Sequence, residues 1–162
     1  MALVRDFESV ADFALHLAAA EVAVHVAAHH ALDRAAAIIE ADAKHQIGEY
    51  QDAAGPFNAW PQLAESTQAE RARLGFAPDE PLLRTGELRD SISREVRADE
   101  AAVGSTSDIM VYQELGTSRI PPRPVLGPAA FKNKDRIEQI LGEAVVQALE
   151  YGAAGAFVKL PD

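Results

Sequence analysis

The sequence contains no cysteine, which excludes disulfides and thiolate-bound metal sites. Aromatic residues make up only 6% of the chain, and Trp60 is its one tryptophan. Alanine supplies much of the 48% apolar fraction, and a small side chain buries little area, so a partner surface would help to stabilise such a chain. A length of 162 residues predicts a single domain, residues 1–162, with a core of its own.

Basic residues are also scarce. The chain has 15 Lys and Arg residues against 25 Asp and Glu residues, which gives a formal net charge of −10. A nucleic-acid binder normally carries a basic face, and anionic membranes attract basic segments. We therefore expect neither sequence-specific nucleic-acid binding nor membrane association. An acidic surface keeps a monomer soluble, and it equally suits the lining of a channel through which DNA passes without sticking.

Two further features are missing: a signal-peptide pattern at the N-terminus and a long apolar run anywhere in the sequence. Residues 1–8 show no basic stretch followed by an apolar core, so no signal peptide is expected. The sequence has no uninterrupted run of 18 apolar residues, so no transmembrane helix is expected either. Together with the lack of cysteine, these absences are compatible with a reducing cytoplasm.

Glycine and proline are absent before Gly48, and alanine recurs throughout this stretch. Apolar residues at spacings of three and four predict a long helix over residues 1–47, beginning near residue 5. A break near residues 29–30 would divide it into two helices, and the sequence leaves both versions open. A helix of this length needs neighbours along its second half.

The next segment, residues 48–90, is rich in loops because glycine and proline interrupt it repeatedly. Within it the pattern predicts a short helix from Pro61 to Leu74. Proline suits the first helical position, and Gly75 suits the stop. Thr85 is the predicted N-cap of a short turn that follows.

The remaining segments complete an α+β fold. Residues 91–127 are expected to form a β-hairpin, at about 91–105, and a proline-rich arm. Residues 109–115 fit a short helix or an extension of the sheet. A sustained amphipathic stripe predicts the C-terminal helix at about 128–151, followed by a tail at 152–162.

Catalytic patterns are weak. His25 and His29 lie four residues apart and would share a helix face, which is half of a metal site, but no third ligand has the matching spacing. The serines lack a nucleophile elbow, and no histidine follows His45. We expect no catalytic, cofactor or metal site. Two alternatives stay open: a small metal-dependent hydrolase built on His25, His29 and a carboxylate, and a cytoplasmic module that binds a basic partner.

Residues 112–128 are the most informative stretch. Pro121, Pro122 and Pro124 should hold it stiff and extended, because proline restricts φ and removes a backbone donor. A stiff arm that leads into a helix indicates assembly rather than catalysis.

Two side chains are candidate anchors. Arg123 lies between prolines, so its reach is restricted, and we expect it to make an intersubunit or loop-anchoring ion pair, with Glu114 as the candidate partner. Trp60 is either a core anchor under a long loop or an anchor in an interface, and the core role is favoured.

Five segments follow one another along the chain: residues 60–67, 82–92, 103–105, 112–117 and 120–126. Each segment alone is a weak signal, whereas the ordered set is specific. Together they resemble the neck or tail-completion proteins of long-tailed bacteriophages, including the Mu-like virion morphogenesis proteins, and the resemblance covers about residues 57–150. This chain departs from the pattern in its long alanine- and histidine-rich N-terminal helix and in Val125, where a larger aromatic residue is usual.

The resemblance implies a small α+β subunit with no catalytic residues. It implies one group of residues that forms the turn into the first strand: Leu83, Thr85, Gly86 and Leu88. It implies a second group that builds the loop between the hairpin and the last helix: Glu114, Gly116, Thr117, Pro122, Arg123 and Pro124.

The function implied is that of a structural virion protein at the phage head–tail junction, which assists tail assembly and attachment to the head. Such a subunit would form a hexamer-like or dodecamer-like homo-oligomeric ring, through which DNA could pass. It would contact head-completion, tail-terminator or tail-tube proteins, and a tail-terminator role is the alternative. The expected location is the virion, assembled in the bacterial cytoplasm; prophages and gene-transfer particles also encode such proteins.

Overall fold

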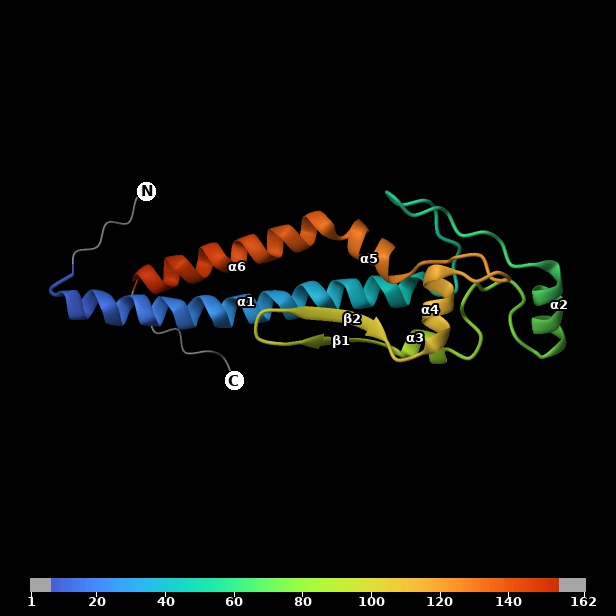
Figure 1. The fold of residues 1–162 in the computed structure, drawn as a ribbon, viewed down its shortest axis with the longest axis horizontal. Helices are drawn as coiled ribbons and strands as arrows, with labels where there is room; N and C mark the ends of the chain where they lie inside the picture. Colours follow the sequence, from blue (N-terminus) through green and yellow to red (C-terminus); the bar gives the residue numbers. More distant parts are fainter. Residues whose placement is uncertain (1–6, 155–162) are drawn as a thin grey trace. The chain divides into compact units, whose positions relative to one another are not determined.

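The computed structural model describes the backbone of residues 7–154 and the side chains of residues 7–150. The fold is α+β, as the sequence predicts, with a long N-terminal helix, a two-stranded β1–β2 hairpin and a C-terminal helix (Figure 1). The elements are α1 (Val10–Gln46), α2 (Glu65–Arg73), α3 (Glu87–Asp90), β1 (Ile92–Val96), β2 (Ala101–Ser105), α4 (Asp108–Leu115), α5 (Leu126–Lys132) and α6 (Lys134–Ala154).

Helix α1 is continuous over 37 residues, so the version with a break near residues 29–30 is wrong. It begins where the Ser9 hydroxyl accepts a hydrogen bond from the Asp12 amide at 3.0 Å. A serine in this position satisfies one of the free N–H groups of the first turn. The helix ends before Gly48, whose φ of 108° breaks the helical path. The Gly48 amide then donates to the Pro81 carbonyl at 2.9 Å.

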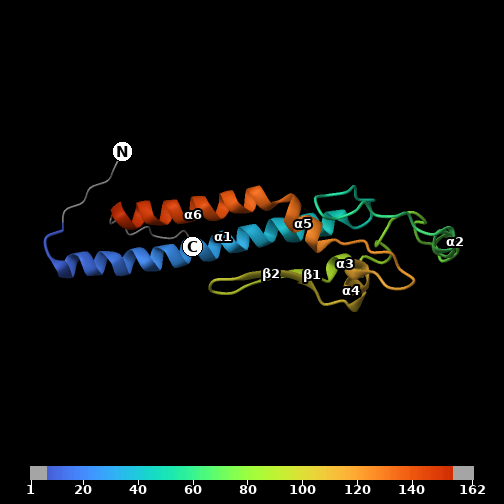
Figure 2. The same ribbon diagram turned by 45° about the horizontal axis from the view of Figure 1, so that its top comes forward.

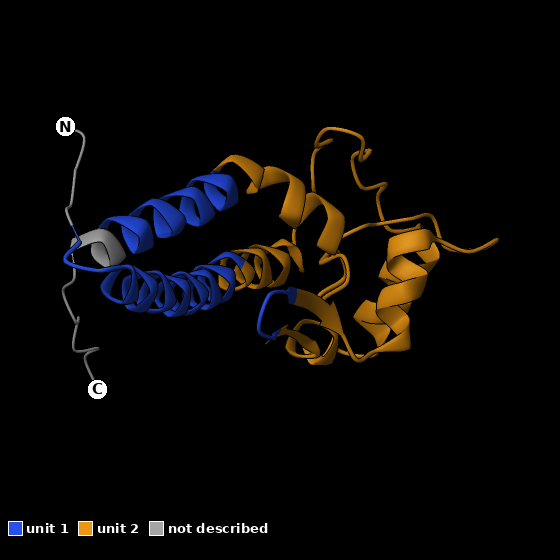
Figure 3. Ribbon diagram, turned by 60° about the vertical axis from the view of Figure 1, so that its left-hand side comes forward, with its two compact units in different colours: residues 1–35, 96–101, 136–162 blue, residues 36–95, 102–135 orange. Residues whose placement is uncertain are grey.

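The chain forms two compact units, each assembled from segments that are distant in sequence (Figure 3). Unit 1 comprises residues 1–35, 96–101 and 136–162, and unit 2 comprises residues 36–95 and 102–135. Helix α1 contributes to both units.

Unit 1 has a thin core. Helix α6 runs antiparallel to the first part of α1 (Figures 1 and 2). Among the described residues of this unit, the buried apolar side chains are Ala31, Ala35, Ile140 and Ala148. The tip of the hairpin joins α1 where His29 Nδ1 lies 3.2 Å from the Arg97 carbonyl oxygen. Because three of the four buried side chains are alanine, little apolar area leaves water here.

Unit 2 has the larger core, which draws on α1, β1, α4, α5 and the loop before α2. Its buried members are Ala43, Ile47, Trp60, Ile92, Met110, Val125 and Ala129. Leucines from the loop before α3 and from α3 itself pack against this cluster. The short elements therefore depend on a shared core for their stability, since isolated helices of this length are marginal in water.

Helix α2 begins at Glu65, so the prediction that it starts at Pro61 is wrong. Trp60 is buried and the carbonyls of Pro61 and Gln62 accept hydrogen bonds from Arg123, so this stretch stays extended. The predicted stop is correct, since the helix ends at Arg73 and Gly75 has a φ of 82°.

The predicted single helix at 128–151 is two helices, α5 and α6, separated at Asn133. The side-chain nitrogen Nδ2 of Asn133 donates to the Asp42 carboxylate at 3.0 Å and to the Ala129 carbonyl at 2.9 Å. A side chain that takes a carbonyl of the preceding turn competes with the helical pattern. Helix α6 continues through Gly152 to Ala154, and the rest of the predicted tail lies outside the described residues.

Helix α1 is long and apolar enough to cross a membrane by length and composition, and its most apolar 18-residue stretch has no buried residue. The absence of an uninterrupted apolar run therefore does not exclude a span, contrary to the expectation from the sequence. Core helices of soluble proteins and signal sequences meet the same criterion. The length and composition of α1 therefore do not by themselves show that it spans a membrane.

Candidate functional site

The proline-rich arm, residues 116–125, connects α4 to α5 within unit 2. It starts at Gly116, whose φ of 72° and ψ of 175° are accessible to glycine almost alone. A Cβ atom at this position would lie 2.9 Å from Pro122 Cδ and 3.0 Å from the Ile120 carbonyl oxygen. Thr117 closes a turn, because its amide donates to the Ile120 carbonyl at 2.8 Å and its hydroxyl accepts from the Ile120 amide at 3.0 Å.

Arg123 anchors the arm to the loop that precedes α2. Its guanidinium donates to the Pro61 carbonyl from Nε at 3.0 Å and from Nη2 at 2.9 Å, and Nη2 also reaches the Gln62 carbonyl at 3.0 Å. The side chain is only 5% exposed, and burial lowers the pKa of this guanidinium. The Arg123 amide donates to the Gln113 carbonyl at 2.7 Å. Arg123 therefore anchors a loop through backbone carbonyls.

Glu114 has a different role from the one expected. Within the described chain it makes no ion pair with Arg123; instead its Oε1 accepts hydrogen bonds from the amides of Val125 and Leu126, both at 2.7 Å. These amides lie at the N-terminus of α5, where free N–H groups and the helix dipole favour a negative charge. Glu114 therefore ties the end of α4 to the start of α5.

Trp60, in the same loop before α2, also binds the arm. Its indole N–H donates to the Pro124 carbonyl at 2.9 Å, and its amide donates to the Gln51 carbonyl at 2.8 Å. The side chain is 5% exposed and belongs to the core of unit 2. Its burial supports the core-anchor interpretation of this tryptophan over the interface anchor.

A second buried arginine was not identified from the sequence as an anchor. Arg71 Nη1 donates to the carbonyls of Glu80 at 2.6 Å and Leu83 at 2.9 Å, so it holds the loop that leads from α2 to α3. Nothing in the local sequence distinguishes Arg71 from the exposed Arg73 two residues later. The difference arises from the loop that folds over one face of α2.

Tyr50 supports the same region. Its hydroxyl donates to the Asp79 carboxylate at 2.6 Å and accepts from the Leu63 amide at 3.0 Å. Burial raises the pKa of Tyr50, and the hydrogen bond to Asp79 raises it further. The loop before α2 is thus held by hydrogen bonds at both of its ends.

The expected turn into the first strand exists, with a different cap. Gly86, with a φ of 91°, is the N-cap residue of α3, and Thr85 Oγ1 accepts only a long contact of 3.4 Å from the Glu87 amide. The prediction that Thr85 caps this turn is therefore wrong. Leu88 packs against the core of unit 2 from α3.

The two histidines of the pair make different contacts. In α1, His25 Nε2 lies 4.0 Å from Glu21 Oε1 and its side chain is exposed, whereas His29 Nδ1 contacts the Arg97 carbonyl oxygen. In the described part of the chain, no group of three or more His, Cys, Asp or Glu side chains is placed to hold a metal ion.

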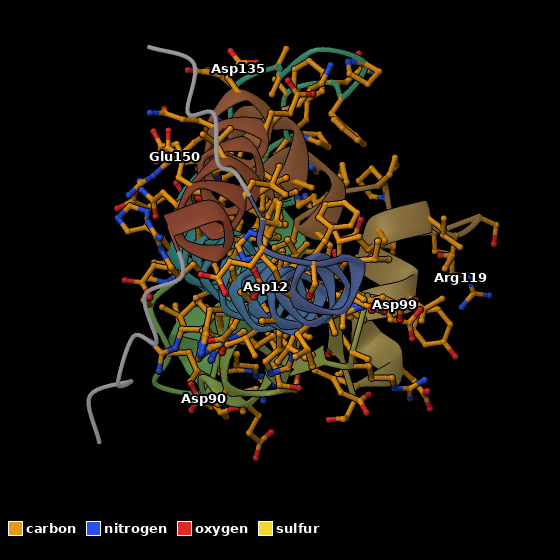
Figure 4. The ribbon with its side chains drawn as sticks, turned by 90° about the vertical axis from the view of Figure 1, so that its left-hand side faces the viewer. Asp12, Asp90, Asp99, Arg119, Asp135 and Glu150 are labelled. Carbon is orange, nitrogen blue, oxygen red and sulfur yellow. The ribbon has the colours of Figure 1, made fainter. Side chains whose placement is uncertain are left out.

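The arm region exposes apolar side chains instead. Four of the eight residues of α4 are apolar or aromatic and more than half exposed: Ile109, Val111, Tyr112 and Leu115. The Arg119 side chain projects from the neighbouring turn (Figure 4). Asp108, at the start of α4, is exposed as well, so this helix face carries an acidic side chain in addition to the apolar ones.

No protein-family model, curated protein sequence or solved structure matches this chain.

Proposed function

We propose that this chain is a structural protein of the head–tail junction of a long-tailed bacteriophage, a neck or tail-completion subunit that assembles into a ring. In this role it has no enzymatic activity. It completes the tail and attaches it to the head, in contact with adjacent head-completion, tail-terminator or tail-tube proteins.

The observation that supports the proposal is how the segments of the resemblance meet in space. Residues 60–62 contact residues 123–124 through the hydrogen bonds of Trp60 and Arg123, and Glu114 binds the N-terminus of α5. These side chains bind backbone groups and leave the arm rigid. A rigid arm beside an exposed apolar helix is a suitable connecting part for an assembly, because little conformational entropy is lost when it binds.

The oligomeric state of the purified full chain tests the proposal. Size-exclusion chromatography with light scattering should give a closed oligomer, and negative-stain electron microscopy should show rings. Arg123→Ala should weaken assembly because it releases the arm, whereas Arg73→Ala, an exposed arginine in α2, should not. A chain that stays monomeric at every concentration would contradict the ring.

Two further observations separate the virion role from other homo-oligomers. The gene should lie among portal, capsid and tail-tube genes, and antibodies against the chain should label virions at the junction between head and tail. A gene among metabolic enzymes, or labelling confined to the cell extract, would contradict the proposal. Labelling at the end of head-free tails would identify the tail-terminator role.

A further inference from the structure

The segment that contains α2 is not held to the rest of unit 2 by buried apolar side chains. We call residues 63–80 the α2 flap; they include α2 and the loop residues on either side of it. Among these residues, all of which the structure describes, the one buried side chain is Arg71. None of them belongs to the core of unit 2 or to the apolar side chains that pack against that core. Burial of apolar area therefore contributes little to the attachment of the flap.

The backbone of the α2 flap is separate as well. Within the described chain, no backbone–backbone hydrogen bond joins the flap to a residue outside it. Figures 1 and 2 show α2 apart from the other helices of unit 2. An isolated helix of nine residues is marginal in water, so α2 depends on the side chains that attach the flap.

The Tyr50 hydroxyl binds both ends of the α2 flap from outside it. It accepts a hydrogen bond from the Leu63 amide at 3.0 Å and donates to the Asp79 carboxylate at 2.6 Å. One side chain of the neighbouring loop therefore holds the first and the last part of the flap together. Loss of this hydroxyl would release both parts at once.

Arg71 binds the backbone on either side of a strained residue. Leu82 has a φ of 64°, and it is the one non-glycine residue of the described chain with a positive φ. A leucine stays in this region only where its surroundings hold it. Arg71 Nη1 donates to the Glu80 carbonyl at 2.6 Å and to the Leu83 carbonyl, outside the flap, at 2.9 Å. Release of Arg71 would therefore let the backbone at Leu82 return to a preferred conformation.

Arg84 makes a weaker contact with the flap. Its Nη2 lies 3.9 Å from Glu70 Oε1, and its guanidinium carbon lies 4.9 Å from the centre of the Phe76 ring. The Arg84 and Glu70 side chains are 48% and 55% exposed, so solvent screens this ion pair. Tyr50 and Arg71 are therefore the principal attachments.

The chain on both sides of the flap is held independently. Arg123 binds the carbonyls of residues 61–62, and the Gly48 amide binds the Pro81 carbonyl at 2.9 Å. Neither contact involves a residue of the flap. The two ends of the flap therefore stay in place when its own attachments break.

We propose that the α2 flap opens as one unit about its two ends while the core of unit 2 stays folded, with Tyr50 and Arg71 as the groups that hold it closed. Segments of low local stability are the ones that a binding partner displaces most readily. The inference goes beyond the proposed function and does not depend on it, since a ring subunit and a monomer would both contain the flap.

Hydrogen exchange of the full chain, followed by mass spectrometry, tests the opening. The amides of α2 should be protected about a hundredfold less than those of residues 36–46 of α1. Low concentrations of urea should hardly change exchange in α2, because a local opening exposes little new surface. If urea accelerates exchange as steeply in α2 as in residues 36–46, α2 opens only when unit 2 unfolds, and the inference is overturned.

Variants of the two attachments separate a concerted opening from fraying of α2. Tyr50→Phe keeps the ring and removes the hydroxyl, so it should lower the protection of all α2 amides by about tenfold and that of residues 36–46 by less than about twofold. Arg71→Met keeps the unbranched stem and removes the guanidinium, and it should give the same pattern. The matched controls are Tyr112→Phe and Arg73→Met, at exposed side chains, which should leave the protection of α2 unchanged.

The outcomes separate this inference from the proposed function. If neither Tyr50→Phe nor Arg71→Met changes the protection of α2, the helix frays independently of these side chains and the inference is overturned. Equal losses in α2 and in residues 36–46 would place both side chains in the folding unit of the core and overturn it too. If Arg71→Met does not fold, Tyr50→Phe and the urea series of the wild type decide. Light scattering measures the ring separately, so a monomeric wild type contradicts the ring and leaves the flap in place.

Discussion

The indole N–H of Trp60 donates to the carbonyl of Pro124 at 2.9 Å, which joins two residues that are 64 positions apart. Pro124 has no amide hydrogen, so its carbonyl is the only backbone group through which it can be held by a hydrogen bond. Because Trp60 is the one tryptophan and lies in the core of unit 2, its fluorescence reports the unfolding of this unit directly.

Removal of the Arg123 side chain should destabilise unit 2. Arg123→Ala removes three hydrogen bonds from a buried charged group, and we expect a loss of about 2–3 kcal/mol in the free energy of unfolding by urea titration. Arg123→Lys should lose less, because an ammonium keeps the charge but not the two-pronged geometry. Arg73→Ala, at an exposed arginine, should change stability by less than about 0.5 kcal/mol. Equal losses for Arg123→Ala and Arg73→Ala would contradict the anchoring role.

Removal of the Glu114 carboxylate should weaken the junction of α4 and α5. Glu114→Ala leaves the amides of Val125 and Leu126 without their acceptor, and we expect a loss of about 1–2 kcal/mol, as for a helix cap. Glu114→Gln keeps one acceptor oxygen and should lose less. Urea unfolding followed by tryptophan fluorescence measures both, with the exposed Glu49→Ala as the control. A stability for Glu114→Ala equal to that of the control would show that water replaces the carboxylate without cost.

Two glycines with positive φ should respond differently to alanine. Gly75 has a φ of 82°, and no atom of the described chain beyond its immediate neighbours lies within 4 Å of the place that a Cβ atom would take. Gly75→Ala should therefore cost only about 1 kcal/mol of backbone strain. Gly116→Ala adds a contact with Pro122 to a backbone conformation that alanine avoids, so it should cost about 1–2 kcal/mol more. Thermal or urea unfolding of the pair compares them, and equal costs would contradict the close approach of the arm to itself.

Glu40 should give unit 2 a stability component that acid removes. Hydrogen bonds from Lys44 at 2.6 Å and from Arg94 at 2.7 Å lower the pKa of Glu40 below its usual 4.5. A lowered folded-state pKa stabilises the fold above the unfolded-state value, and this contribution is lost as the pH falls through the folded-state pKa.

The stability advantage of the wild type over Glu40→Gln should therefore be constant above about pH 5.5 and shrink below pH 4.5. Urea unfolding at a series of pH values measures the difference. If the free energies of unfolding of the wild type and of Glu40→Gln differ by the same amount from about pH 6 to about pH 3, Glu40 is not stabilised as a carboxylate.

Local patterns in the sequence were enough for the elements whose causes are local. The absence of glycine and proline before Gly48 predicts α1, because nothing interrupts the i to i+4 hydrogen bonds. Ile92 and Val96, which share one face of an extended segment, predict the first strand of the hairpin, and Gly75 predicts the end of α2. These features depend on backbone freedom and on the spacing of side chains within a few residues. Both can be read directly from a short stretch of sequence.

The predictions failed where a distant group decided the outcome. Pro61 does not start α2 because its carbonyl is bound by Arg123, 62 positions away. The predicted C-terminal helix is divided at Asn133, whose side chain reaches Asp42, 91 positions away. Glu114 binds amides of α5 rather than the nearby Arg123. In each case the sequence offers several chemically equivalent hydrogen-bond partners, and nothing local distinguishes the one that is used.

The amino-acid sequence alone determined the α+β class, the helical character of the N-terminal segment, the hairpin and the acidic, cysteine-free character of the chain. Only the tertiary structure decided which arginines became anchors and which apolar side chains of α1, α4 and α6 remained exposed. The physical reason is that a hydrogen bond or a buried contact needs two groups at one place. Propensity along the chain specifies the conformation of each segment, whereas the partners of a segment follow from how all of the segments pack.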